Sequence, residues 1–300
     1  MAGSQARIRL VVLDVDGTLL DPSGAITSRV GEAVRAAHDK GCLVSLASGR
    51  RLWAVRPIVE ALGIKLPVIL YNGAIIYDLA QDTVLFQARL DTQALRAAVD
   101  LLWDAGYQPV VYESPTSGER VYSGLSERDN PATAYYFDRP TVQPIRLDRG
   151  ALGAVRDALL LAAMGDEPQV RELETQVALR ALQCQTLVER QSFVPGSRWW
   201  QLDVTAPRTS KGEALRHLCS LTGVAHAETL ALGDGINDLE LLRSAGLGVA
   251  MGNAVAELKQ AAVAVVADNA HDGAAEALER FVLGARVDEQ AATIEPAQRV

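Results

Sequence analysis

Apolar runs of strand length alternate with helical patterns over two separate parts of the chain. Six mostly apolar runs have the length of a strand: 8–13, 42–47, 68–71, 228–232, 247–250 and 262–266. Helical patterns lie between or after these runs, at 27–40, 52–62, 212–221, from 239 onward, and at 273–283. Strands that alternate with helices predict a parallel sheet covered by helices on both faces, which is the doubly wound α/β class.

The segment between residues 84 and 204 has a different order of elements and predicts a second domain. Its apolar runs favour six strands: 84–89, 109–112, 119–122, 159–163, 184–188 and 199–203. Its helical patterns are at 92–105, 149–159 and 169–182. The stretches 80–83 and 206–209 have the composition of linkers. We therefore expect a core of residues 1–83 and 205–286, an inserted α+β domain over 84–204, and a flexible tail over 287–300.

Two acidic residues, Asp14 and Asp16, stand one residue apart where the first apolar run ends. A strand followed by an Asp-Gly turn explains Gly17, but it does not explain a second acid at the end of a buried strand. Two like charges there repel each other unless a cation or a shared proton intervenes. Carboxylate oxygens suit Mg²⁺, which commonly takes one or two of them and leaves its other positions to water and phosphate.

A second acidic cluster follows the run at 228–232. Asp234 and Asp238 lie in the segment Gly233-Asp234-Gly235-Ile236-Asn237-Asp238, just before a helical pattern. If both strands belong to one parallel sheet, their carboxyl ends lie at the same edge. We therefore expect these two acids to converge with Asp14 and Asp16 on one metal-sized site.

Two further polar residues stand where a helix begins. Ser48 follows the run at 42–47, so it is either an ordinary helix cap or part of an anion site at a helix N-terminus. Lys211 begins the helix at 212–221, where a cation opposes the helix dipole unless an anion lies nearby. It is one of only four lysines among 29 basic residues, although a solvated surface lysine remains an alternative. Asn72-Gly73 is read as a turn without assigned chemistry.

Together these segments resemble the haloacid dehalogenase-like superfamily of phosphotransferases. The resemblance rests on four motifs in order: DVDGT at 14–18, SGR at 48–50, the Lys at a helix start, and GDGIND at 233–238. The long insert, NGA at 72–74 and MGNA at 251–254 are similar to its Cof-type branch. The resemblance covers about residues 8–284, with the insert matched only by length and pattern. It implies a Rossmann-like core with a larger inserted cap.

The resemblance also implies a role for each motif residue. Asp14 would attack phosphorus to form an aspartyl-phosphate, and Asp16 would protonate the leaving oxygen and then activate water. Mg²⁺ would be held by the Asp14 carboxylate, the Asp16 backbone carbonyl and Asp234, with Asp238 as an outer-shell or additional ligand. The transferred phosphoryl group would be bound by Ser48, Gly49, Lys211 and Asn237. Arg50 could join them or form a surface ion pair.

We therefore expect a Mg²⁺-dependent phosphatase acting on small phosphomonoesters such as sugar phosphates. A phosphomutase shares the Asp pair and is the main alternative, and a non-catalytic phosphate-binding regulator is a third. The two mutually repelling acids weigh against the third. Aromatic residues of the insert either line a substrate pocket or form its core: Tyr112, Tyr135, Tyr136, Trp199 and Trp200.

The composition of the chain limits its possible partners and the compartment in which we expect it. The net charge of −8 disfavours nonspecific binding to nucleic acid. Three widely spaced cysteines, Cys42, Cys184 and Cys219, argue against a disulfide framework or a zinc site. The apolar run that follows the first residues is too short for a signal peptide, and it ends in an acidic residue. No apolar run is long enough to span a membrane. These features favour the cytoplasm and no membrane partner, and they leave the oligomeric state open.

Overall fold

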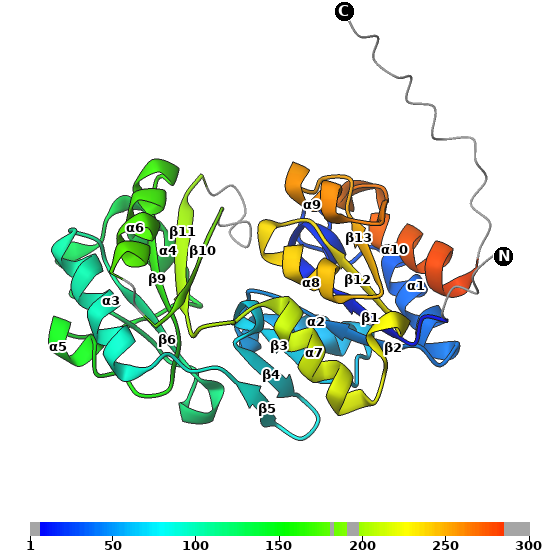
Figure 1. Cartoon of the computed structure of the whole chain (residues 1–300), viewed down its shortest axis with the longest axis horizontal. Coiled ribbons are helices and arrows are strands. Elements are labelled where there is room, and N and C mark those ends of the chain that lie inside the picture. Colours follow the sequence, from blue (N-terminus) through cyan, green and yellow to red (C-terminus); the bar gives the residue numbers. More distant parts are fainter. Residues whose placement is uncertain (1–6, 181–182, 191–197, 285–300) are drawn as a thin grey trace, which may run out of the picture.

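The computed structural model describes residues 7–180, 183–190 and 198–284. The tail predicted over 287–300 lies outside these residues. The chain forms a core that carries both described ends and a cap inserted between two parts of that core (Figure 1). No helix in the described ranges is long and apolar enough to cross a membrane.

Five parallel strands form the central sheet of the core, in the order β14, β13, β12, β1, β2. Their bounds are Leu10–Leu13 for β1, Leu43–Leu46 for β2, Thr229–Gly233 for β12, Leu247–Ala250 for β13 and Ala264–Val265 for β14. The predicted doubly wound parallel sheet is therefore confirmed. Because β1 and β12 are neighbours, the residues that follow them meet at one edge of the sheet.

Helices cover both faces of this sheet. Their bounds are Ser28–Asp39 for α1, Leu52–Leu62 for α2, Lys211–Thr222 for α7, Leu239–Ser244 for α8, Ala256–Ala261 for α9 and Gly273–Leu278 for α10. Alternate side chains of β1 point to opposite faces. Val11 and Leu13 pack in one apolar cluster with α1, α2 and α10, whereas Leu10 and Val12 pack in another with α7, α8 and α9. The near-continuous apolar sequence of β1 follows from this burial on both sides.

A three-stranded antiparallel sheet adjoins the central sheet, and it corrects one expectation. It consists of β3 (Val68–Leu70), β4 (Ile75–Asp78) and β5 (Thr83–Gln87), and a bridge from Ala47 to Ile69 links it to the end of β2. The strand predicted at 84–89 was assigned to the insert, but it pairs with β4. Residues 80–83, predicted as a linker, belong to the hairpin between β4 and β5. The chain therefore leaves the core after β5.

The cap contains one six-stranded sheet, in the order β10, β11, β9, β6, β7, β8. Its strands are β6 (Val110–Glu113), β7 (Val121–Ser123), β8 (Ile145–Arg146), β9 (Ala158–Gly165), β10 (Gln185–Arg190) and β11 (Trp200–Thr205). Its helices are α3 (Thr92–Asp104), α4 (Pro131–Phe137), α5 (Arg149–Leu152) and α6 (Glu167–Leu179). All pairs except β7 with β8 are antiparallel, which agrees with the predicted α+β class.

The helix predicted at 149–159 is wrong over most of its length. Only α5 is helical there, and β9 begins at Ala158 with all eight of its residues buried. β9 lies between β11 and β6, and its alternate side chains belong to two different apolar clusters, so it is buried on both faces. A strand of this kind is apolar at every position, and its local pattern cannot be told from that of a buried helix. The predictions also missed α4, β4 and β8.

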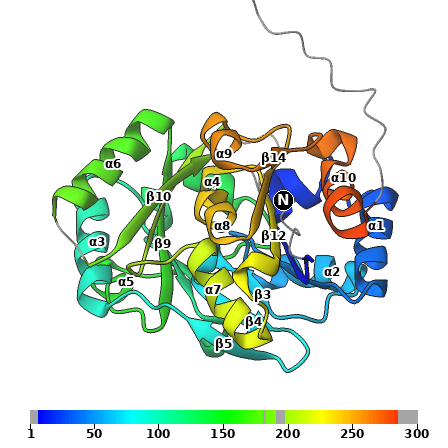
Figure 2. The ribbon, with the colours of Figure 1, turned by 45° about the vertical axis from the view of Figure 1, so that its right-hand side comes forward.

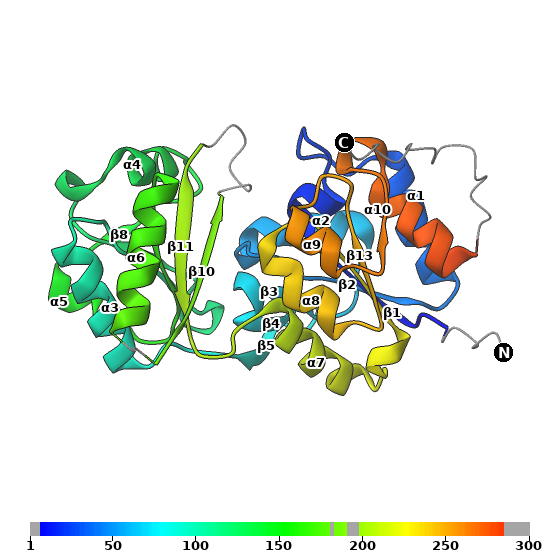
Figure 3. The same cartoon turned by 45° about the horizontal axis from the view of Figure 1, so that its top comes forward.

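One face of the cap sheet packs against α3 and α6, and the other face, which also carries α4, is turned toward the core. Leu161 and Ala163 of β9 pack with α3 and α6, whereas Leu160 and Ala162 belong to an apolar cluster that includes core residues. The strands β10 and β11 form the edge of the cap nearest the core (Figures 1 and 3). In the core, α7 packs against β3 and β4 (Figure 2).

Candidate active site

Asp14 follows the buried strand β1 and is itself buried, with 5% of its surface exposed. The chain then turns sharply through Gly17, whose φ of +76° is rarely adopted by residues with a side chain. A Cβ atom on Gly17 would lie 2.3 Å from Asp234 Oδ2. The Asp-Gly turn and the second acidic cluster are therefore in direct contact.

Three acids converge at this edge of the sheet. Asp14, Asp234 and Asp238 each offer a carboxylate oxygen, and these atoms lie within 4.8 Å of one another. Asp238 Oδ2 also accepts hydrogen bonds from the backbone N–H groups of Asp234 and Gly235, both at 3.0 Å. The convergence predicted from the parallel strands is present for these three carboxylates.

Lys211 is the cation at the centre of this acidic cluster. Its side chain is fully buried, and its Nζ donates to Asp14 Oδ1 at 2.6 Å and to Asp238 Oδ1 at 2.7 Å. Ser210 caps the helix by accepting from the backbone N–H of Glu213 at 3.0 Å, which places Lys211 at the first helical position. The alternative of a solvated surface lysine is therefore wrong.

Burial and mutual repulsion perturb the ionisation of these groups. Burial, followed by the charges of Asp238 and Asp234, raises the pKa of Asp14 well above its usual value, although Lys211 opposes the shift. Burial and Asp238 raise the pKa of Asp234 to about 7. Burial by itself lowers the pKa of Lys211, but Asp14 and Asp238 outweigh it and raise that pKa overall. The cluster thus has more negative charge than one lysine neutralises.

Asp16 lies apart from this cluster. Its two carboxylate oxygens accept a bidentate pair of hydrogen bonds from Arg50, at 2.7 Å from Nε and 2.6 Å from Nη2. Its carboxylate is not among those grouped with Asp14, so any metal contact would come from the backbone carbonyl that the resemblance implies. Of the two roles left open for Arg50, the structure shows the ion pair, and its acid partner is a motif residue.

Of the residues expected to bind phosphate, Lys211 contacts the cluster, and Gly49 and Asn237 line the same cleft as Asp14. Ser48 is buried and its Oγ accepts from the backbone N–H of Arg50 at 3.1 Å, while α2 begins only at Leu52. Ser48 is therefore not the cap of α2. A Cβ on Gly49 would lie 2.9 Å from Asn72 Oδ1, so the backbone approaches that side chain closely. Asn237 Nδ2 donates to the same Oδ1 at 3.1 Å.

Comparison with known proteins identifies the family. The model of the haloacid dehalogenase-like hydrolases matches residues 11–278. The chain belongs to this family. It is 30% identical over 253 residues to the HMP-PP phosphatase of Cronobacter sakazakii, covering 83% of this chain and 86% of that protein. It is 28% identical over 280 residues to the pyridoxal phosphate phosphatase YbhA of Escherichia coli, covering 89% and 96%.

A solved structure agrees with this assignment. A phosphatase of the haloalkanoate (HAD) superfamily from Bacteroides thetaiotaomicron superposes with a TM-score of 0.77 at 25% identity, covering 94% of this chain and 97% of that one. The predicted membership of the haloacid dehalogenase-like family, Cof-type branch, is confirmed, as is the predicted enzyme class of phosphoric monoester hydrolase.

Two asparagines of this haloacid dehalogenase-like site were missed or left without a role. Asn253, from the MGNA segment, donates through Nδ2 to Gly17 O at 2.8 Å and to Asp234 Oδ2 at 3.2 Å. Asn72 is buried beside Asn237 and has a φ of +53°. Asn72 follows β3, so the rule that singled out Ser48, a polar residue after a strand, could have identified it.

The site opens into a cleft between core and cap, with a volume of about 530 Å³. Asp14, Asp16 and Asp234 line it on the core side. On the cap side it is lined by Arg171, Val188, Glu189, Arg190 and Trp200. Of the cap aromatics left open above, Trp200 lines this cleft. A substrate bound at the acidic cluster is therefore covered by the cap.

Proposed function

We propose that this protein is a Mg²⁺-dependent phosphatase that hydrolyses small phosphomonoesters through an aspartyl-phosphate on Asp14. The observation that carries the proposal is the buried Asp14, held by Lys211 and set against Asp234 and Asp238 at the carboxyl ends of neighbouring strands. A nucleophile, a fixed cation and a cation-binding acid group within one small space are the parts that phosphoryl transfer requires.

The donor set fits a divalent cation. Three carboxylates with oxygens within 4.8 Å supply the hard ligands that Mg²⁺ takes, and the raised pKa values of Asp14 and Asp234 report negative charge that Lys211 does not neutralise. Asp14, Asp234, Asp238 and the Asp16 carbonyl are the groups that we assign to hold it. When bound, Mg²⁺ would neutralise charge on the phosphoryl oxygens.

The reaction proceeds in two displacements. Asp14 Oδ attacks phosphorus and the bond from phosphorus to the leaving oxygen breaks. Asp16 has to enter this step in its protonated form, and it gives its proton to the leaving oxygen and becomes the carboxylate. Asp16 then takes a proton from water, whose oxygen attacks phosphorus and releases phosphate and free Asp14. Lys211, with Ser48 and Asn237, stabilises the phosphoryl oxygens throughout. Arg50 holds the Asp16 carboxylate at the entrance of the site.

We also propose that the natural substrate is a small metabolite in the cytoplasm. The relatives named above act, by their names, on HMP-PP and pyridoxal phosphate, which are small phosphorylated compounds. The cap over the cleft leaves little room for a folded phosphoprotein. The three cysteines are all free, as expected for a reducing compartment.

The proposal is tested by Asp14→Asn, with Asp39→Asn as the matched control on the exposed end of α1. Phosphate release from a panel of phosphomonoesters should fall at least about a thousandfold in Asp14→Asn and stay unchanged in Asp39→Asn. Chelator should abolish release, Mg²⁺ should restore it, and Ca²⁺ should restore it poorly because its shell is larger and looser.

Two further measurements separate the mechanism from its alternatives. Acid-quenched protein should carry a phosphoryl adduct on the peptide that contains Asp14, found by mass spectrometry. Formation of an isomeric sugar phosphate from hexose 1-phosphates, without phosphate release, would indicate the phosphomutase instead. Activity of Asp14→Asn within tenfold of wild type, or full activity in excess chelator, would contradict the proposal.

A further inference from the structure

A turn of the cap contacts the core at the point where α2 begins. Residues 114–120 connect β6 to β7, and Glu119 of this turn accepts a hydrogen bond through Oε1 from the backbone N–H of Leu52 at 2.6 Å. The same oxygen accepts from the Tyr71 hydroxyl at 2.9 Å. One carboxylate of the cap therefore binds two separate segments of the core, which are the start of α2 and the turn after β3.

The core leaves the start of α2 without a cap of its own. Arg51 occupies the N-cap position of this 11-residue helix, and its side chain makes no capping hydrogen bond. The first backbone N–H groups of a helix have no partner within the helix, and a carboxylate placed beside them also meets the positive end of the helix dipole. Glu119 supplies that carboxylate from the other domain. Arg51 Nη2 donates to Thr141 O at 3.4 Å, which is a second contact between the cap and the start of α2.

The two segments that Glu119 contacts flank the active-site loop at 48–50. Leu52 lies two residues after Arg50, at the end of this loop. On the other side, the backbone N–H of Tyr71 donates to Arg50 O at 3.3 Å. The loop is thus supported by the start of α2 and by the turn after β3, and Glu119 joins these two supports to each other.

Both sides of this contact have an uncommon backbone conformation. Glu119 has a φ of +54° and Tyr71 has a φ of +52°, in the left-handed region that residues with a side chain rarely adopt. Positions of this kind persist where surrounding contacts hold them, and they gather at functional sites. Burial, followed by the charge of Glu119, raises the pKa of Tyr71 well above its usual value, so the hydroxyl stays protonated and remains a donor.

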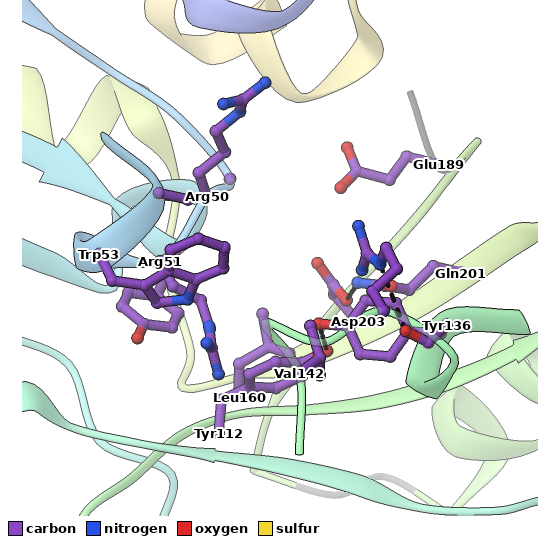
Figure 4. Close-up of a pocket in the computed structure, with 14 residues that line it drawn as sticks. Arg50, Arg51, Trp53, Tyr112, Tyr136, Val142, Leu160, Glu189, Gln201 and Asp203 are labelled. Atoms are coloured by element: carbon purple, nitrogen blue, oxygen red, sulfur yellow. Dashed lines mark hydrogen bonds between the residues drawn. The ribbon is translucent and has the colours of Figure 1, made fainter. Parts of the chain in front are cut away.

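Arg50 connects this contact to the active site. Arg50 and Arg51 lie side by side, and their guanidinium groups extend in opposite directions (Figure 4). The Arg50 guanidinium forms the bidentate pair with Asp16, so the position of that carboxylate depends on the backbone that carries Arg50. A displacement of about 1 Å at a catalytic group can cost about a hundredfold in rate.

We propose that Glu119 is a positioning residue, which holds Arg50 where it orients Asp16. It acts by joining the cap to the start of α2 and to Tyr71, the two supports of the loop at 48–50. The proposal rests on the proposed function, since it concerns the proton transfer that we assign to Asp16. Glu119 is outside the set of described residues that line the active-site cleft, so it is given no catalytic step.

Two esters of similar size test the effect on proton transfer: phenyl phosphate and p-nitrophenyl phosphate. Phenol is a weaker acid than p-nitrophenol, so its oxygen depends more on the proton from Asp16 as the bond to phosphorus breaks. Glu119→Ala should lower kcat/KM about tenfold for phenyl phosphate, the size of a lost helix cap, and by less than about threefold for p-nitrophenyl phosphate. A loss of folded protein would lower both values equally.

Two variants serve as controls in the same assay. Glu119→Gln keeps an oxygen that can accept from Leu52 and Tyr71, and it should stay within about threefold of wild type for both esters. Glu127→Ala removes an exposed acid from another turn of the cap and should leave both values unchanged.

A double-mutant cycle shows whether the effect passes through Arg50. If Glu119 acts by holding Arg50, Glu119→Ala should add less than about twofold to the loss caused by Arg50→Gln. Hydrogen exchange at Arg50 Nε, followed by ¹⁵N NMR without substrate, gives a second measurement. The signal is assigned by its absence in Arg50→Gln, and its exchange should be at least about fivefold faster in Glu119→Ala than in wild type.

Three outcomes would each overturn the proposal: equal losses for the two esters, losses that multiply fully in the double variant, or an unchanged exchange rate at Arg50 Nε in Glu119→Ala. A wild-type protein that releases no phosphate from either ester with Mg²⁺ present would instead refute the proposed function. The exchange rate at Arg50 Nε would still decide whether Glu119 holds Arg50, because that measurement requires no turnover.

Discussion

Replacing Lys211 by Met removes the one cation that contacts Asp14 and Asp238 in the described part of the chain. Lys211 is fully buried and donates at 2.6 and 2.7 Å to these carboxylates. Removing one partner of a buried ion pair costs about 3–5 kcal/mol, because the remaining charge stays buried without compensation. We expect a loss of this size in the free energy of unfolding at pH 8 in chelator. Met has nearly the same length, so little volume is lost.

The loss should depend on pH in a defined direction. Burial and repulsion already raise the pKa of Asp14 and bring that of Asp234 to about 7, and removing the lysine raises both further. The folded variant then binds protons that the unfolded chain has released above a pH of about 4. Its stability therefore falls as the pH rises from about 4 until it passes the raised pKa values of the folded variant; that of Asp234 lies above about 7. At pH 5 the loss should be smaller by at least about 1.4 kcal/mol, the equivalent of one pKa unit.

Urea unfolding followed by circular dichroism measures this effect. Lys65→Met makes the same chemical change at an exposed position and should leave stability within about 0.5 kcal/mol of wild type. Mg²⁺ at a hundredfold excess over its Kd should restore about 2.7 kcal/mol by binding only the folded variant. A loss below about 1 kcal/mol at pH 8, or one that does not grow with pH, would refute the view of Lys211 as the buried counter-ion of this cluster.

Two other substitutions test the geometry of the site. Gly17→Ala should lower the free energy of unfolding, measured in urea, by about 1–3 kcal/mol more than Gly24→Ala does. Both glycines have a positive φ, but only a Cβ on Gly17 would meet Asp234, at 2.3 Å. Equal losses in the two variants would contradict this reasoning. Arg50→Gln should lower kcat about 10- to 100-fold with little change in KM, because it releases the Asp16 carboxylate, and Arg50→Lys should recover only part since it cannot form the bidentate pair. A change confined to KM in steady-state phosphate release would instead indicate that Arg50 binds substrate.

The acidic cluster could be predicted because its members follow parallel strands. Strand β1 and strand β12 are each recognisable as apolar runs, and parallel strands place their carboxyl ends together wherever they lie in the sequence. Asp14, Asp234 and Asp238 therefore had to approach one another once the class of sheet was known. Lys211 could be predicted for a different reason. A lysine that begins a helix is unfavourable unless an anion lies beside it.

The cap offers no such rule. Its strands are mainly antiparallel, so residues that meet across β10 and β11 are set by pairing register, which local patterns do not contain. The strand β5 was assigned to the wrong sheet because its sequence does not say whether β4 or the cap will pair with it. The strand β9 was read partly as a helix because a strand buried on both faces has lost the alternation that identifies strands.

Contacts between cap and core depend on the folded arrangement alone. Asn72 comes from the core and reaches Glu189 and Asp203 of the cap, 117 and 131 residues away. Glu189 and Asp203 are unremarkable in their local sequences, and their raised pKa values arise chiefly from burial in the folded protein. The residues at the strand ends that we propose to act on phosphate could thus be predicted from the order of residues in the sequence. The contacts between cap and core, in contrast, depend on which surfaces the two domains bring together in the folded protein.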